Sequence, residues 1–497
     1  MLSQIKNRIF LANPIDVFKW SCITSLFFHI VAAYLSEGFH RPDEHLGMLR
    51  MMSYKLGTYP ASELSWEIPA QIRSWMQPSI YYSIAKLFSF TGGKNPFHLA
   101  FILRLFSSIL GFTSLMLLAK LAFKFFKQSF VLNLVIITIL LNPYVPFFHA
   151  RTTTENFGIT FFIYGLFFLL KHADSPNNVI NKIPYSFAFW AGACFSCSFI
   201  FRLQMITMIG PLAIWALLYG KYNLRCFIIT SLAFIATLGI GLLIDYWGYG
   251  VLTFSPYNYV YQNIVLGKAS GFGIDPWWRY LEKIFLRGLP PLSLLYLIPF
   301  IWMWYKKPRS YLTWISAPFF VAHSLIAHKE LRFVFGLGIL APIALGHFIQ
   351  WLEEKNLLHK IFRPTLTWLM IFQAIILLLI SSCRPALAPI KYYHYLYSLD
   401  SAPDKIITLG VFRDQLKFYL KKPLQEVIME DREQVKQLLQ TKQNLPLWFL
   451  TDKLEDMQIF EDTSKCKLQF SLYPEWSLQF IKKYLKSSKV WILYFCQ

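Results

Sequence analysis

Long runs of apolar residues alternate with short polar segments over residues 1–390. A run of about 17 to 25 apolar residues is long enough to cross the hydrocarbon core of a bilayer as an α-helix. The pattern therefore predicts an α-helical polytopic membrane protein with about 11 transmembrane helices (within a range of about 11–13). The predicted helices are 17–38, 99–119, 130–148, 156–171, 183–201, 206–220, 227–245, 288–305, 311–327, 333–351 and 366–382.

Basic residues lie in alternate loops between these helices. Because cytoplasmic loops carry the excess of Lys and Arg, this alternation places the amino terminus in the cytoplasm. Two long loops, 39–98 and 246–287, and the chain after Cys383 are then expected outside. The apolar stretch 80–90 fits this order only as an interfacial or re-entrant helix. The residues that set the order are Lys120, Lys124, Lys127, Lys171, Lys182, Lys221, Arg225, Lys306, Lys307, Arg309, Lys355, Lys360 and Arg363.

The pattern changes near residue 391, which divides the chain into a transmembrane domain, 1–390, and a small extracytoplasmic α/β domain, 391–497. Short β-type runs alternate there with amphipathic helical runs. The expected strands are KIITLG, QEVIME, PLWFLT and KVWILYF, and the expected helices are FRDQLKFYLKK, REQVKQLLQ and EWSLQFIKKYLK. Cys466 and Cys496 are expected there either as a disulfide, as an oxidising compartment permits, or as two thiols.

Composition excludes an ordinary soluble domain, because 55% of the residues are hydrophobic and only 15% are charged. The net charge of +21 would suggest a nucleic-acid partner in a soluble protein. Here much of the Lys and Arg lies in short loops between apolar runs, so the charge indicates topology and membrane lipids instead.

The first candidate for chemistry is a pair of carboxylates, Asp43 and Glu44, directly after the first predicted span. Pro42 is suited to the first position of a helix, which puts both carboxylates in the first turn. They serve either as a helix-terminal charge or as a general base that accepts the proton of a sugar hydroxyl.

Cations on the same predicted side form the second candidate. His328, Lys329 and Arg332 lie in a loop of about five residues between two apolar spans, and Arg202 lies in another outer turn. Arg and Lys bind phosphate well, so we predict a site for the phosphate of a lipid-linked donor. Snorkelling of the basic side chains to the interface is the alternative.

Further outer segments mix aromatic rings with amides and charges, as both sugar sites and membrane interfaces do. For the turn 151–156, the alternative to a substrate contact is that Thr154 caps the next helix. The residues predicted to contact substrate are Trp66, Glu67, Arg73, Arg151, Glu155 and Asn263.

The order of these motifs resembles glycosyltransferase family 22, the polytopic mannosyltransferases that build GPI anchors and lipid-linked oligosaccharides. The resemblance covers residues 20–350 and is carried by HRPDEH, LSWEIPAQIRSW, RTTTENF, DYWGYG with SPYNYVYQN, and HKELRF. It implies a GT-C fold, a polyprenyl- or dolichyl-phosphate-mannose donor, a lipid-linked or glycan acceptor, and inversion to an alpha-mannoside. No metal or other cofactor is implied.

Within that resemblance, Asp43 corresponds to the base and Glu44 to its acidic partner, while His328, Lys329 and Arg332 correspond to the donor-phosphate site. The chain departs from the family pattern at Gly47, Arg50 and Leu331, which leaves the acceptor open. The carboxy-terminal domain suggests a bacterial inner-membrane enzyme with a periplasmic site. An endoplasmic reticulum enzyme that faces the lumen is the alternative.

Two other functions compete with this interpretation. A transporter would place its essential charges at the bilayer midplane within an internal repeat, and the sequence contains no such repeat. A GT-C enzyme that moves another sugar from a polyprenyl-phosphate donor fits the sequence as well.

Overall fold

The protein, seen as a computed structural model, divides into two compact units. The helical unit comprises Met1–Ser36, Leu46–Gly92 and Phe101–Cys383, and the mixed unit comprises Glu37–His45, Gly93–Ala100 and Arg384–Gln497. The structure describes residues 12–173, 183–358, 362–383, 386–409, 416–429, 431–440, 446–461, 466–478 and 490–497.

Each predicted span coincides with apolar helix in the structure. Four helices among the described residues are long and apolar enough to cross a membrane on their own: Pro14–Leu35, Pro96–Phe125, Leu224–Tyr249 and Leu331–Glu354. Most of the others are shorter apolar helices, so the predicted number of spans stays a prediction. The helix bounds are α2 Pro14–Leu35, α5 Pro96–Phe125, α6 Ser129–Leu140, α7 Val145–His149, α8 Thr154–Leu170, α9 Tyr185–Phe201, α10 Ile206–Leu218, α11 Leu224–Tyr249, α14 Leu292–Lys306, α15 Tyr311–Leu325, α16 Phe335–Glu354 and α17 Phe362–Ser381.

The prediction of one continuous helix over 130–148 is wrong. Helix α6 ends at Leu140, and α7 begins at Val145. Between them Asn142 precedes Pro143, and the residue before a proline is disfavoured in the helical region. The Asn142 side chain instead accepts a hydrogen bond from the Tyr144 N–H at 3.2 Å, which stabilises a turn.

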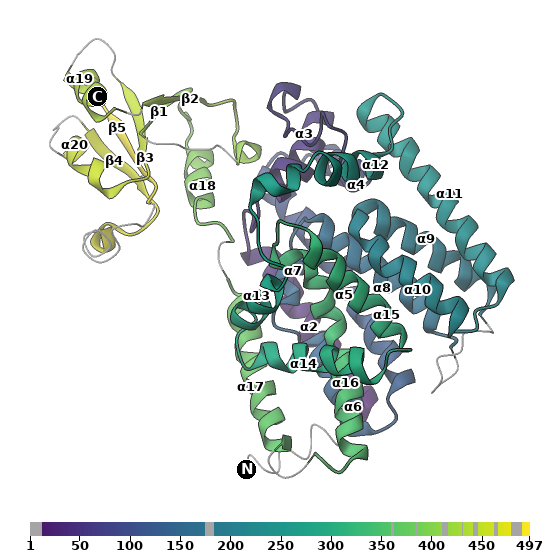
Figure 1. Ribbon diagram of the computed structural model, residues 1–497. Helices are drawn as coiled ribbons and strands as arrows, with labels where there is room; N and C mark the ends of the chain where they lie inside the picture. Colours follow the sequence, from purple (N-terminus) through teal and green to yellow (C-terminus); the bar gives the residue numbers. More distant parts are fainter. Residues whose placement is uncertain are drawn as a thin grey trace. The chain divides into compact units, whose positions relative to one another are not determined.

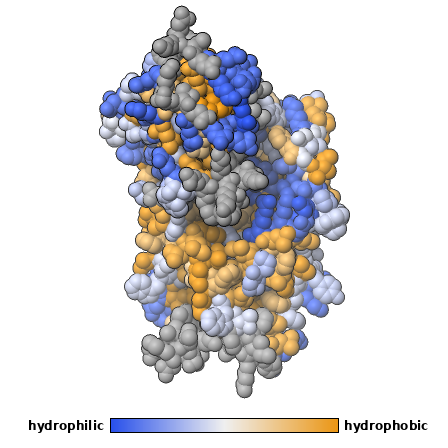
Figure 2. Space-filling model, turned by 90° about the vertical axis from the view of Figure 1, so that its left-hand side faces the viewer, coloured by the Kyte–Doolittle hydropathy of each residue, from blue (hydrophilic) through white to orange (hydrophobic). Residues whose placement is uncertain are grey.

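Small residues let neighbouring helices of the helical unit approach closely. A Cβ at Gly192 of α9 would lie 2.1 Å from the Thr230 carbonyl oxygen of α11, and one at Gly165 of α8 would meet the Phe195 ring. Such close approach is typical of helices that pack within membranes. Figure 2 shows that apolar side chains cover much of one face of this unit, as a lipid environment requires.

Short helices from the two predicted outer loops gather at one end of the helical unit. Figure 1 shows α3 Arg50–Lys55, α4 Met76–Phe90 and α12 Ser255–Val260 there. Asp245, near the end of α11, joins them: its carboxylate accepts hydrogen bonds from the Trp75 N–H at 2.7 Å, the Ser74 hydroxyl at 2.8 Å and the Ser255 hydroxyl at 2.9 Å. The apolar stretch 80–90 belongs to α4, which is not among the candidate spans of the described chain.

The mixed unit contains a five-stranded sheet of order β2-β1-β3-β5-β4. Strands β1, β2 and β3 pair in parallel, while β5 is antiparallel to β3 and β4. A disulfide joins Cys466 of β4 to Cys496 of β5, which resolves the two expectations for these cysteines. The bounds are β1 Lys405–Leu409, β2 Gln425–Met429, β3 Leu447–Thr451, β4 Cys466–Ser471, β5 Ile492–Cys496, α18 Ile390–Ser398, α19 Arg432–Gln440 and α20 Met457–Glu461.

The sequence predicted four of these strands and α19 correctly but missed β4, an edge strand with little apolar character. The helix expected over 412–422 is wrong within the described residues, where a short 3-10 turn covers Lys417–Tyr419. Most of the helix expected over 475–486 lies outside the described residues.

Both ends of the predicted loop 39–98 belong to the mixed unit. Phe97 stacks on His394 and Tyr419, with ring centroids 3.7 and 4.6 Å apart, and Phe39 is buried in the same apolar cluster. His45 and the Tyr419 hydroxyl lie 3.2 Å apart within hydrogen-bond reach. Residues 37–45, which carry the predicted carboxylate pair, are therefore held by aromatic packing of the mixed unit.

Candidate active site

Three segments of the helical unit bring two arginines to one carboxylate. Glu155 lies in the first turn of α8, Arg202 directly follows α9, and Arg332 lies in the 3-10 turn Leu331–Val334 before α16. Glu155 Oε1 lies 3.3 Å from an Arg202 nitrogen and 3.6 Å from Arg332 Nε. The sequence predicted these residues from three separate outer turns, and the structure brings them together.

A second carboxylate, Glu330, completes this charge cluster. It lies 2.9 Å from Arg332 Nε and 3.1 Å from His328 Nε2. The Phe333 ring lies close to both guanidinium groups, at 5.0 Å from Arg202 and 5.1 Å from Arg332. We name Glu155, Arg202, His328, Glu330 and Arg332 the charge cluster.

The charge cluster is suited to recognise an anion. Its two arginines are nearly buried, with 8% and 13% of the side-chain surface exposed, and the carboxylates hold both in fixed positions. Each guanidinium is a planar group with five N–H donors, and such a group binds the oxygens of carboxylates and phosphates through parallel hydrogen bonds. Fixed arginine forks of this kind bind phosphate oxygens with defined geometry.

Lys329 lies between His328 and Glu330 in sequence, but its ammonium group points elsewhere. Its Nζ donates to the carbonyl oxygens of Ile326 at 2.6 Å and Asp275 at 2.9 Å. Burial lowers the pKa of Lys329 below its ordinary value. The structure therefore places Lys329 on backbone acceptors, whereas His328, Glu330 and Arg332 interact with one another.

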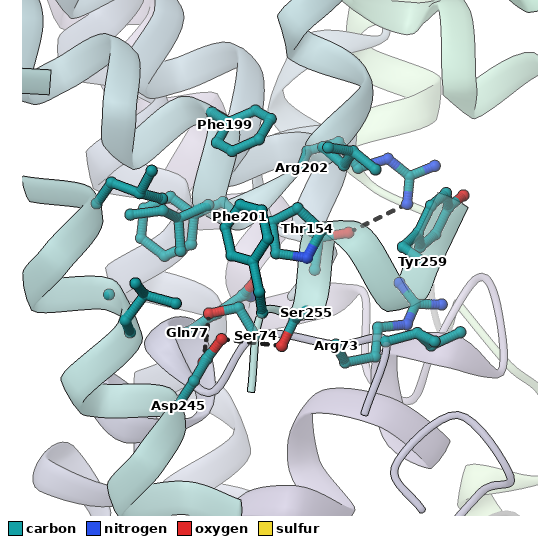
Figure 3. A pocket seen from close by; sticks show the side chains of 18 of the residues that line it. Arg73, Ser74, Gln77, Thr154, Phe199, Phe201, Arg202, Asp245, Ser255 and Tyr259 are labelled. Atoms are coloured by element: carbon teal, nitrogen blue, oxygen red, sulfur yellow. Dashed lines mark hydrogen bonds between the residues drawn. The ribbon is translucent and has the colours of Figure 1, made fainter. Parts of the chain in front are cut away.

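A pocket opens beside the charge cluster. Figure 3 shows the side chains of Arg202 and Thr154 in it, together with Arg73, Gln77 and Tyr259. Apolar residues of α9 and α11 form part of its wall: Phe199, Ile200, Phe201, Leu238, Gly241 and Leu242. The pocket, which we name the polar pocket, therefore combines hydrogen-bonding groups with a wall of apolar side chains.

One predicted residue at this pocket, Arg73, is bound to another predicted residue, Glu67. Arg73 donates to both carboxylate oxygens of Glu67, at 2.7 and 3.0 Å. This pairing fixes the Arg73 guanidinium at the pocket wall. Gln77 and Tyr259 were not predicted from the sequence, because they carry no charge; Gln77 lies just after the motif LSWEIPAQIRSW, and Tyr259 lies within SPYNYVYQN. Gln204, which follows Arg202 closely, donates to the Tyr259 hydroxyl at 2.5 Å.

Other predicted residues make local contacts. The Arg151 guanidinium donates to the Ser36 carbonyl at 2.6 Å, at the end of α2. Asn263 donates to the Tyr259 carbonyl at 3.1 Å, and the Lys268 ammonium lies 4.5 Å from the centre of the Trp66 ring. The residue that caps α8 is Thr153, whose hydroxyl accepts from the Asn156 N–H, so the alternative that assigned the cap to Thr154 is wrong.

Asp43 and Glu44 belong to the mixed unit. A π-helical segment begins at Glu44, close to the expected start. Glu44 is buried, and its Oε1 accepts the backbone N–H groups of His40 at 2.8 Å and Arg41 at 3.1 Å. Asp43 is half-buried. Glu44 thus stabilises the turn that presents Asp43.

A second, apolar pocket lies among α14, α15 and α16. Leu331, Val334 and Phe335 line it, so the turn that carries Arg332 separates this pocket from the charge cluster. We name it the apolar pocket. Its other lining residues include Tyr296, Leu297, Phe300, Trp304, Phe320, Leu337, Gly338 and Ala341, with Arg287 as a charged member.

Solved structures with the same fold support this architecture. The chain aligns with ArnT from Cupriavidus metallidurans bound to undecaprenyl phosphate at a TM-score of 0.56 and 12% identity, over 96% of this chain and 97% of that one. It aligns with the oligosaccharyltransferase of Archaeoglobus fulgidus at a TM-score of 0.51 and 10% identity, over 89% and 69% of the two chains. These similarities confirm the predicted GT-C fold.

The curated relatives that the chain matches are named as mannosyltransferases. GPI mannosyltransferase 3 of Candida albicans is 23% identical over 67% of this chain and 68% of its own length. Mannosyltransferase APTG1 of Arabidopsis thaliana is 24% identical over 67% and 58%, and human GPI alpha-1,2-mannosyltransferase 3 is 23% identical over 65% and 56%. The chain thus spans less than two thirds of the length of the latter two.

The model of the Alg9-like mannosyltransferase family matches residues 20–414. This match confirms both the predicted resemblance and the predicted class of enzyme, a glycosyltransferase. The chain is an integral membrane protein that belongs to the Alg9-like mannosyltransferase family.

Proposed function

We propose that this protein transfers mannose from a polyprenyl- or dolichyl-phosphate donor to a lipid-linked or glycan acceptor, with inversion to an alpha-mannoside. The observation that carries the proposal is the charge cluster, in which Arg202 and Arg332 meet at Glu155. A relative from Schizosaccharomyces pombe is named as a probable Dol-P-Man:Man(7)GlcNAc(2)-PP-Dol alpha-1,6-mannosyltransferase, and ArnT was solved with undecaprenyl phosphate. Both names support a lipid-phosphate donor.

The chemistry needs one base and one site for the departing phosphate. The acceptor hydroxyl attacks the anomeric carbon, the bond to the phosphate oxygen breaks, and the hydroxyl proton passes to a carboxylate, for which we propose Asp43. The lipid phosphate leaves as an anion and needs no proton. Arg202, Arg332 and His328 stabilise the charge that develops on it.

We assign the isoprenoid chain of the donor to the apolar pocket. This pocket lies against the turn Leu331–Val334, so a chain in it would have its phosphate next to Arg332. The acceptor sugar is assigned to the polar pocket, where Gln77, Arg73 and Tyr259 offer donors and acceptors to hydroxyl groups. Trp66, Glu67 and Asn263 stay predicted contacts of the substrate.

Filling the apolar pocket tests the assignment of the donor chain. A Cβ at Gly338 would meet no atom within 4 Å, so a Phe there extends into open space. We expect Gly338→Phe to raise the KM for a long-chain donor about tenfold, because the apolar surface that the donor chain can no longer bury is worth about 1–3 kcal/mol. The KM for the acceptor should stay within about twofold of the wild-type value. Gly210→Phe is the matched control, because a Cβ at Gly210 of α10 is equally free and lies outside both pockets. Equal donor KM values in the two variants would contradict the assignment.

We propose that the charge cluster and the mixed unit face the non-cytoplasmic side, the periplasm of a bacterium or the lumen of the endoplasmic reticulum. The disulfide Cys466–Cys496 supports this orientation, because disulfides persist in oxidising compartments.

Cysteine labelling tests the orientation. In a chain whose free cysteines are replaced, we expect Ser62→Cys and Ser270→Cys, both exposed, to react with a membrane-impermeant maleimide in intact cells or sealed luminal-side-out vesicles. Lys221→Cys and Lys307→Cys, also exposed, should react only after permeabilisation, because their loops carry the cytoplasmic charge pattern. If either pair of cysteines showed the opposite labelling behaviour, the proposed orientation would be excluded.

The function itself is tested with purified protein, labelled polyprenyl-phosphate-mannose and lipid-linked acceptors, in the absence of nucleotide sugar. Formation of an alpha-mannoside supports the proposal. If the protein transfers only another sugar from the same lipid carrier, the proposed donor sugar is wrong. If it moves intact lipid across the membrane without transferring sugar, the transporter is favoured.

A further inference from the structure

The loop that carries His328, Glu330 and Arg332 is bound to Asp275 of the second outer loop. The Asp275 N–H donates to the Ala327 carbonyl at 3.0 Å, and Lys329 Nζ donates to the Asp275 carbonyl at 2.9 Å. Lys329 Nζ also donates to the Ile326 carbonyl at 2.6 Å, and only 2% of Lys329 is exposed. The Lys329 ammonium therefore connects its own segment to the backbone at Asp275, 54 residues away in sequence.

A second lysine, Lys283, connects the same two segments. Lys283 of α13 (Arg279–Arg287) donates to the Asp275 carboxylate at 2.7 Å and to the Lys329 carbonyl at 2.6 Å. The hydrogen bond from Lys283 lowers the pKa of Asp275, so this carboxylate is ionised at neutral pH. Asp275, Lys283 and Lys329 thus form a connected set of contacts, which we name the latch; the Asp275 carboxylate also lies 3.4 Å from Arg279.

The latch positions His328, Glu330 and Arg332 through the short backbone segment that they share with Lys329. Glu330 is extended, with φ −116° and ψ 139°. Neighbouring side chains of an extended segment point in opposite directions. His328 and Glu330, 3.1 Å apart, therefore lie on one side with Arg332, and Lys329 anchors the chain from the other side. Displacing Lys329 would displace its neighbours as well.

We propose that Lys329, with Asp275 and Lys283, is a positioning residue that holds His328 and Arg332 in place for the donor phosphate and does not itself bind the donor. This inference rests on the proposed function. A lysine already committed to buried carbonyl oxygens would have to leave those acceptors unsatisfied in order to reach a phosphate, which is costly. A misplacement of about 1 Å in a catalytic group can reduce a rate about 100-fold.

The kinetic experiment compares Lys283→Met, Lys283→Arg and Lys329→Met with Glu282→Gln. Glu282 is the matched control, because it lies next to Lys283 on α13 and pairs with the half-buried Arg279 at 2.6 Å. Arg279 also lies 3.4 Å from the Asp275 carboxylate, so Glu282→Gln should leave the contacts of Asp275 in place. We expect Lys283→Met and Lys329→Met to lower kcat/KM for the donor about 10- to 100-fold, mainly through KM, with the acceptor KM nearly unchanged. Lys283→Arg, which keeps the charge and the donors, should restore most of the loss, and Glu282→Gln should behave as the wild type.

Hydrogen exchange of the amides of residues 326–333 gives a readout that does not depend on activity. These amides should exchange faster in Lys283→Met and Lys329→Met than in Glu282→Gln, while those of α8 stay unchanged. Unchanged exchange in Lys283→Met would overturn the latch. Faster exchange with an unaltered donor KM would overturn its positioning role. An inactive wild type would instead reject the proposed function and leave the exchange result to decide on the latch.

Discussion

Asp43→Asn is expected to reduce kcat about 10²- to 10⁴-fold, the usual contribution of a general base, and to leave the KM for the donor within about twofold. The amide has nearly the same shape as the carboxylate but cannot accept the hydroxyl proton. Donor binding is assigned to the charge cluster, to which Asp43 does not belong, so the donor KM should depend little on this substitution. The measurement is a steady-state transfer assay with each substrate varied in turn.

Glu44 provides the matched control for the base. Its Oε1 accepts two backbone N–H groups, from His40 and Arg41, and the side chain is buried. Glu44→Gln retains an acceptor for them and should change kcat far less than Asp43→Asn. Glu44→Ala removes the acceptor and should lower the free energy of unfolding by about 1–3 kcal/mol. A folded Asp43→Asn enzyme with near-normal turnover, or a larger kcat loss in Glu44→Gln, would move the base away from Asp43.

The helices could be predicted from the sequence because lipid imposes a strong and local requirement. Each span needs a continuous apolar run, and hydropathy detects such runs directly. The break at Asn142 was missed because the run on either side of it stays apolar, although Pro143 marks the boundary. The edge strand Cys466–Ser471 was missed because polar Lys467 and Gln469 give it a weak apolar pattern.

The charge cluster could be predicted only in part. The predicted topology puts Arg202, Glu155 and Arg332 on one side of the membrane, but a topology contains no information on which side chains contact one another. The sequence grouped Lys329 with the phosphate ligands because it lies between His328 and Glu330, and it contains no information on where the ammonium group points. An extended backbone at Glu330 separates Lys329 from His328 and Arg332, and that conformation depends on contacts with Asp275 and Lys283, far away in sequence.

Arg332→Ala is expected to lower kcat/KM for the donor about 30- to 1000-fold, equivalent to about 2–4 kcal/mol of transition-state stabilisation. Arg332 faces Glu155 and Glu330 at 3.6 and 2.9 Å, so its guanidinium is fixed before the donor arrives. Arg332→Lys keeps the charge but loses the planar fork, and we expect an intermediate loss. Initial rates at limiting donor and saturating acceptor measure the effect directly.

The control for Arg332→Ala is Arg309→Ala, an exposed arginine of a predicted cytoplasmic loop, which should leave transfer unchanged. Arg202→Ala should resemble Arg332→Ala, because both guanidinium groups share Glu155. The double variant should lose less than the product of the two single losses, since residues that act on one group are not additive. A normal rate for Arg332→Ala at limiting donor would remove Arg332 from the phosphate site, and fully multiplicative losses would mean that the two arginines act on separate groups of the substrates.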